Sequence, residues 1–141
     1  MRKELYSTAA QHFLKAVQIN SMYPEIWFML GFVMMKSGDF VSAAGALTRV
    51  VQQNPDNGEA WNNLGRCLEE QDMIKEAFFA LGEATKYMRE SYRVWDNYLS
   101  LALRNESFLQ AVTAMEHLLE LKGKDGIRPA ALELTVNQIV A

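Results

Sequence analysis

Three tryptophans recur at one fixed spacing along the chain. Trp27, Trp61 and Trp95 are each 34 residues apart, and other residue types follow the same period. The recurring positions are a Leu-Gly pair at 30–31 and 64–65 and an alanine at 43, 77 and 111. A period of this length is typical of stacked repeats, in which each unit buries its apolar face against its neighbours. The chain is therefore predicted to be an array of similar units rather than one irregular globule.

Each unit contains two segments with apolar residues at helical spacing, separated by a short polar break. The breaks fall at 37–39, 71–72 and 105–107. Asp39 and Asp72 are predicted to cap the helices that follow them. Asp56 and Glu59 have the spacing of a capping box. No stretch alternates apolar and polar residues long enough to be a strand, so the sequence predicts an all-α fold.

The pattern W-x-x-L-G, then alanine, then the Asn54-Pro55 pair resembles the tetratricopeptide repeat. This resemblance implies a right-handed superhelix of antiparallel helix pairs, an α-solenoid, with repeats at 24–57, 58–91 and 92–125. The third repeat departs from the pattern, because Tyr98-Leu99 replaces the Leu-Gly pair, and only the first repeat keeps the proline.

The two ends of the chain match half-repeats. Residues 3–20 align with the second helix of a repeat whose first helix is missing. Residues 127–140 resemble a first helix without its partner, or a capping helix. Residues 1–141 are thus expected to form a single domain and to be a piece of a longer array.

Charge, cysteine content and the absence of catalytic motifs exclude several classes of function. The net charge of −3 argues against nucleic-acid binding, which usually needs a concentrated basic surface. The single Cys67 excludes an internal disulfide and fits a reducing compartment, so cytosol or nucleus is expected. The longest apolar run, 26–35, is about half of what a bilayer span requires. His12 and His117 have no ligand partners at suitable spacing and no catalytic motif is present, so neither an enzyme, a metal site nor a cofactor is expected.

In the tetratricopeptide family the first helices of the repeats line an inner, concave surface. Asn63 and Asn97 stand two residues after a tryptophan, at positions that face this groove, and Asn62 stands one residue after it, off the packed stripe of Trp61 and Leu64. An asparagine amide offers a donor and an acceptor together, which match a peptide group. Family members with such asparagine ladders bind the backbone of an extended peptide. The alternative is that these asparagines cap, face solvent or bond adjacent helices.

The rest of the inner surface divides into an apolar, methionine-rich part in the first repeat and a charged part in the other two. The predicted groove residues are Phe28, Met29, Phe32, Met35, Asn62, Asn63, Arg66, Arg93, Asn97, Ser100 and Arg104. The segment 24–37 is apolar all round, however, and such helices are usually buried. The alternative for Phe28, Phe32 and Met35 is contact with a preceding helix.

These features favour a non-catalytic adaptor that binds a peptide or protein surface. Asn63 and Asn97 would bind the backbone of the partner peptide. Its acidic groups would be selected by Arg66, Arg93 and Arg104. The rival hypotheses are a structural array that packs on the rest of its own chain or self-associates through its terminal helices, and a regulatory subunit of an enzyme. Capture of a heat-shock-protein carboxylate is rejected, because Phe28 and Phe32 stand where that clamp needs Lys and Asn.

A narrower resemblance is carried by the segments NPDNGEAWNNLG, KEAFFALGEATKYMRESYRVWDNYL and QAVTAMEHLLELKGK. They are similar to the C-terminal repeats of one longer family member. That resemblance implies a protein of cytosol and nucleus that takes part in assembly of the spliceosomal U5 particle alongside chaperones.

Overall fold

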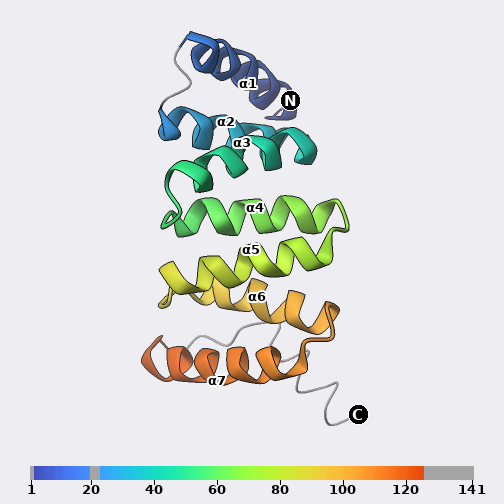
Figure 1. Ribbon diagram of the computed structural model, residues 1–141, viewed down its shortest axis with the longest axis vertical. Coiled ribbons are helices and arrows are strands. Elements are labelled where there is room, and N and C mark those ends of the chain that lie inside the picture. The colour runs from blue at the N-terminus through green and yellow to red at the C-terminus, as the bar shows by residue number, and fades with distance from the viewer. Residues whose placement is uncertain (1, 20–22, 126–141) are drawn as a thin grey trace.

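The computed structural model describes residues 2–19 and 23–125, which form seven α-helices and no strand (Figure 1). The helices are α1 (Arg2–Ile19), α2 (Pro24–Ser37), α3 (Phe40–Gln53), α4 (Gly58–Glu70), α5 (Ile74–Tyr87), α6 (Tyr92–Arg104) and α7 (Phe108–Asp125). Short turns join the successive helices from α2 to α7, so these neighbours run antiparallel, and the helices stack in chain order along the long axis of the molecule.

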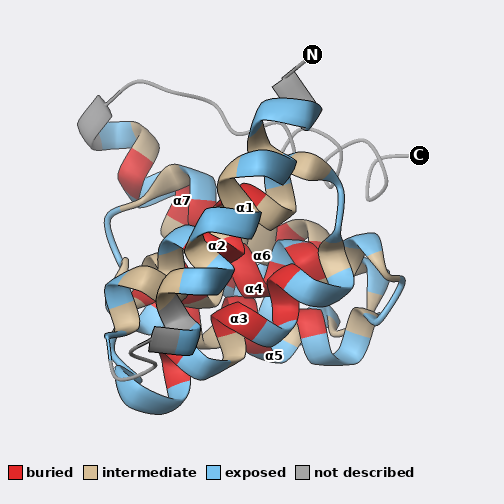
Figure 2. Ribbon diagram, turned by 90° about the horizontal axis from the view of Figure 1, so that it is seen from above, coloured by how far each residue is buried: buried red, intermediate tan, exposed pale blue. Residues whose placement is uncertain are grey.

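The helix pairs α2–α3, α4–α5 and α6–α7 lie within the three segments proposed as repeats, and α1 overlaps the proposed half-repeat with its bounds one residue earlier. The predicted helix at 127–140 lies outside the described residues. Seen from above, buried residues gather between the helices and exposed ones lie on the outer surfaces (Figure 2). The all-α fold predicted from the helical pattern, and the solenoid of antiparallel helix pairs implied by the family resemblance, are confirmed.

The turn inside each repeat uses one backbone device three times. Gly38, Asp72 and Glu106, each 34 residues apart, have positive φ angles of 91°, 60° and 58°. In each turn the following amide donates to the carbonyl five residues before it, with N···O distances of 2.9, 2.9 and 2.8 Å. This left-handed residue satisfies carbonyls that the helix end would otherwise leave unpaired. The period therefore extends to backbone conformation, although only the first turn uses glycine.

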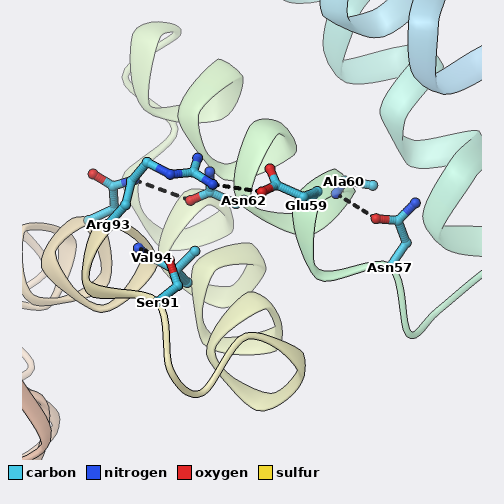
Figure 3. Close-up of polar contacts among 8 residues, drawn as sticks. Asn57, Glu59, Ala60, Asn62, Ser91, Arg93 and Val94 are labelled. Carbon is cyan, nitrogen blue, oxygen red and sulfur yellow. Dashed lines mark hydrogen bonds and ion pairs between the residues drawn. The ribbon is translucent and has the colours of Figure 1, made fainter. Parts of the chain in front are cut away.

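The helix caps agree only partly with the sequence prediction. Asp39 does cap α3, accepting a hydrogen bond from the Ser42 amide at 3.2 Å. The prediction for Asp72 is wrong, because that residue is the left-handed turn residue and the N-cap position of α5 belongs to Met73, which has no capping side chain. The cap of α4 is Asn57 rather than Asp56, with its Oδ1 3.0 Å from the Ala60 amide (Figure 3).

The recurrence of tryptophan every 34 residues has a specific structural reason. The Trp61 indole N–H donates to the carbonyl of Pro55 at 2.7 Å, and the Trp95 indole N–H donates to the carbonyl of Arg89 at 3.0 Å. Each carbonyl lies six residues upstream, in the loop that joins one repeat to the next. The indole ring thus packs against the hydrophobic core, and the indole N–H holds the preceding loop through a hydrogen bond.

The Leu-Gly pairs allow first and second helices to approach closely. A Cβ on Gly31 would lie 2.7 Å from Leu47 Cγ, and a Cβ on Gly65 would lie 2.8 Å from Leu81 Cγ. Both leucines are fully buried, so each glycine leaves the space that a core leucine fills. This contact explains why the pair recurs with the repeat.

Candidate functional site

The first helices α4 and α6 are joined by three pairs of polar side chains, which we call the polar ladder, and one of its arginines also contacts the turn after α4. Arg93 Nη2 lies 2.6 Å from Glu59 Oε1 (Figure 3). Asn97 Nδ2 donates to Asn62 Oδ1 at 3.2 Å. Arg104 Nη1 lies 2.8 Å from Glu69 Oε2, and its Nη2 lies 3.4 Å from Asp72 Oδ1.

The ladder follows from repeat spacing. The paired residues are 34 or 35 positions apart, so they occupy matching places on consecutive first helices. Along α4 the partners are Glu59, Asn62 and Glu69, which lie on one face because they are three and seven residues apart. Four of the predicted groove residues therefore already make side-chain contacts with other residues of the chain: Asn62, Arg93, Asn97 and Arg104.

The two adjacent asparagines are both buried. Asn62 is 0% exposed and Asn63 is 6% exposed, although neither is predicted to lie on the packed stripe of Trp61 and Leu64; for Asn62 this agrees with the alternative that the asparagines bond adjacent helices. The reason is that α4 lies in the middle of the stack, where it packs against α3 and α5, and Asn62 also faces α6 through Asn97. Asn62 Oδ1 accepts the hydrogen bond from Asn97 Nδ2, whereas Asn62 Nδ2 has no hydrogen-bond partner among the described residues. The side chain of Asn63 makes no hydrogen bond with the described residues.

Beside the ladder, between α2 and α4, two cavities open on the same side of the first helices. The larger, of about 450 Å³, is lined by Pro24, Glu25, Phe28, Met29, Asn54, Asn57 and Glu59. The smaller, of about 220 Å³, is lined by Met35, Lys36, Phe40, Arg66 and Glu70. We call the surface made by these residues the α2–α4 groove. It contains four of the predicted residues, Phe28, Met29, Met35 and Arg66.

The helix that precedes α2 does not remove these residues from the groove. Helix α1 packs through Phe13 against Ile26 and Leu30, which lie on another side of α2. Phe28 and Met35 pack at the edge of the core formed by α3 and α4, and Met29 is 44% exposed. Phe32 is half-buried, with Lys36 Nζ 5.4 Å from its ring centroid. The apolar part of the first repeat is thus partly core and partly open surface.

Sequence reasoning missed several groove residues. Asn54 and Asn57 come from the loop between repeats, and Phe40 begins the second helix of the first repeat. The prediction considered first helices only. The available signal was the 34-residue period itself, which places each loop beside the start of the next first helix.

The titratable groups near the groove offer no reactive centre. Burial raises the pKa of the Cys67 thiol to about 12, so the thiol stays protonated at neutral pH and behaves as a small apolar side chain. Burial also raises the pKa of the Tyr98 phenol. Within residues 2–19 and 23–125, no cluster of three or more His, Cys, Asp or Glu side chains could hold a metal ion. None of the helices described here has both the length and the apolar character needed to cross a bilayer.

Comparison with known proteins agrees with this geometry. A family model described as tetratricopeptide repeat matches residues 34–101. The TPR repeat-containing protein C19B12.01 of Schizosaccharomyces pombe is 30% identical over 134 residues, covering 91% of this chain and 16% of that protein. The tetratricopeptide repeat-containing protein trd-1 of Caenorhabditis elegans is 30% identical over 135 residues, covering 96% and 17%. Residues 34–101 belong to the tetratricopeptide repeat family.

Solved structures show the same fold at lower identity. A crystal structure of MamA superposes with a TM-score of 0.79 at 19% identity, over 86% of this chain and 71% of MamA. YrrB, titled a TPR protein with an unusual peptide-binding site, gives a TM-score of 0.76 at 23% identity, over 96% and 68%. Tetratricopeptide repeats are generally non-catalytic scaffolds for protein–protein interaction. The chain spans about a sixth of the length of the two curated relatives that it matches.

Proposed function

We propose that this tetratricopeptide array is a non-catalytic adaptor that binds a peptide segment of a partner protein in the α2–α4 groove. The observation that carries the proposal is the pair of neighbouring cavities there, of about 450 and 220 Å³. The larger cavity falls within the range of some 300–1,000 Å³ that is typical of ligand sites with apolar walls and a few polar groups, and the smaller one extends the surface along the same helices. YrrB, which shares the fold, is described as having a peptide-binding site.

The side chains of the groove suit a flexible partner. Met29 and Met35 carry unbranched thioether chains that adapt to irregular surfaces, and Phe28 adds a broad apolar wall. Asn54 and Asn57 place amide groups at the rim, where they can pair with peptide backbone. On α4–α6, by contrast, the ladder already pairs its polar groups internally.

A charge placed in the larger cavity tests this proposal. We expect Met29→Glu to weaken binding of a peptide selected from a random phage-displayed library by at least about tenfold, because a carboxylate would enter an apolar contact and lie near Glu25 and Glu59. Fluorescence anisotropy with the labelled peptide measures the affinity. Val41→Glu is the matched control, since Val41 is 70% exposed on α3 and lines neither cavity. Equal affinity of wild type and Met29→Glu would refute the site.

A second candidate function is packing against another helix, either of the longer chain or of a second copy. Val112 and Leu119 on α7 are 47% and 52% exposed. Two periods earlier, Ala44 and Val51 of α3 occupy the same positions and are buried in a core shared with α4. The outer face of α7 therefore has the character of a surface that a further helix covers. We expect Val112→Glu with Leu119→Glu to reduce concentration-dependent association in sedimentation equilibrium; a wild-type chain that stays monomeric throughout would count against self-association.

The finer assignment rests on the resemblance to the C-terminal repeats of tetratricopeptide repeat protein 27. It supports the further proposal that the full-length protein works in cytosol and nucleus as an assembly factor for the spliceosomal U5 particle alongside chaperones. Co-purification of U5 proteins with the full-length chain tests it, and their absence from the purified material would remove this assignment.

A further inference from the structure

The polar ladder between α4 and α6 has one missing rung. Its contacts fall at Glu59, Asn62 and Glu69 on α4, and the turn between the last two presents Arg66. One period later, Ser100 stands at the matching place on α6. The side chains of Arg66 and Ser100 make no hydrogen bond or ion pair with any of the residues described for the chain. The ladder therefore leaves one cation on this face without an anion.

Among the three arginines of this face, Arg66 differs in its surroundings. Arg93 and Arg104 are each held by a carboxylate at 2.6 and 2.8 Å. Arg66 is exposed and lines the smaller cavity together with Lys36. Among the described residues that line this cavity, Glu70 is the one carboxylate, beside the two cations Lys36 and Arg66. A partner group that complements this wall is a carboxylate, which an arginine can bind through two parallel hydrogen bonds.

The larger cavity adds an apolar binding place for the partner, and the helix geometry fixes its distance from the cationic place at Arg66. Met29 and Lys36 are seven residues apart on α2, and Glu59 and Arg66 are seven apart on α4. At a rise of 1.5 Å per residue, each interval is about 10 Å along the helix. A peptide in the polyproline II conformation covers about 9 Å in three residues, at about 3.1 Å each, and with three residues per turn its side chains at i and i+3 lie on the same side. The α2–α4 groove thus offers an apolar place and a cationic place one short peptide step apart.

We propose that the α2–α4 groove recognises a linear segment that carries one apolar side chain and, three residues from it, one aspartate or glutamate. The apolar side chain enters the cavity of Phe28 and Met29, and the carboxylate pairs with Arg66, with Lys36 beside it. This inference rests on the proposed peptide-binding function and specifies its ligand. Specificity comes from the unpaired Arg66, because the ladder holds the other arginines.

Selection from a random phage-displayed peptide library on the full 141-residue chain tests the inference. We expect enriched sequences to place an acidic residue three positions from a large apolar residue, in either chain direction. A synthetic peptide of the enriched sequence should bind Arg66→Gln at least about tenfold more weakly than wild type, since a hydrogen-bonded charge is lost. Replacing its acidic residue by Gln should weaken binding to wild type but have little further effect on Arg66→Gln.

Arg104→Gln is the matched control, because it makes the same chemical change on the same face but removes a ladder contact. It should keep wild-type affinity. Enriched peptides without an acidic preference, or equal binding by Arg66→Gln and wild type, would overturn this inference and leave the groove proposal standing if Met29→Glu still weakens binding. Failure to enrich any peptide, or binding insensitive to both Met29→Glu and Arg66→Gln, would overturn both.

Discussion

Replacing Trp95 by alanine is expected to lower the free energy of unfolding by about 4 kcal/mol. Trp95 is 8% exposed, and its ring lies 4.2 Å from that of His117 and 5.8 Å, edge-on, from that of Tyr98. Truncation removes these contacts and leaves a cavity between α6 and α7. It also leaves the Arg89 carbonyl with His117 Nε2, at 2.6 Å, as its remaining side-chain partner. Urea unfolding followed by circular dichroism measures the loss.

Trp95→Phe separates the two roles of the indole. Phenylalanine keeps an aromatic ring but cannot donate to Arg89, so we expect it to recover most of the stability and to stay about 1–2 kcal/mol below wild type. If Trp95→Ala cost less than about 1 kcal/mol, the tryptophan period would not mark the core of each repeat.

The second large effect concerns the contact between Gly65 and Leu81. Leu81 is 0% exposed, so Leu81→Ala should cost about 3 kcal/mol through lost burial and a cavity. Gly65→Ala should cost about 1–2 kcal/mol, because its Cβ would meet Leu81 Cγ at 2.8 Å. In the double variant the new methyl group occupies part of the space that Leu81 vacates. We therefore expect the double loss to be at least about 1 kcal/mol smaller than the sum of the single losses.

Gly45→Ala is the control for this cycle. Gly45 lies in α3, and a Cβ there would meet nothing within 4 Å. Alanine at an open helical position should raise stability by about 0.5–1 kcal/mol. Additive losses at Gly65 and Leu81, or destabilisation by Gly45→Ala, would contradict the packing described for the Leu-Gly pair.

Much of the fold could be predicted from the sequence because the same residue pattern occurs in each 34-residue repeat. Each tryptophan, each alanine and each polar break is seen up to three times, so the helices and their pairing follow without knowledge of any one contact. The cap at Asp72 could not be predicted in this way. Whether an aspartate caps a helix or occupies a left-handed turn depends on one backbone angle, and the glycine that would reveal it occurs only at Gly38.

The site was harder to predict because side chains of the ladder reach across two helices. Sequence reasoning placed Arg93 and Arg104 on the correct helix but could not show that both are held by carboxylates of α4. A signal did exist, since Glu59 and Glu69 precede these arginines by 34 and 35 residues with opposite charge. The burial of Asn62 had no such signal. A hydrophobicity pattern treats asparagine as a surface residue, and its contact with Asn97 appears only when the helices are stacked.

The most direct test of the account is to follow the methionine methyl signals by NMR while the selected peptide is added. The chain has eight methionines, of which Met29 and Met35 line the α2–α4 groove, while Met73 and Met115 lie outside it. We predict that the peptide shifts the Met29 and Met35 signals and leaves those of Met73 and Met115 in place. Peptide binding that shifts Met73 or Met115 while Met29 and Met35 stay unchanged would contradict the claim that the partner enters between α2 and α4.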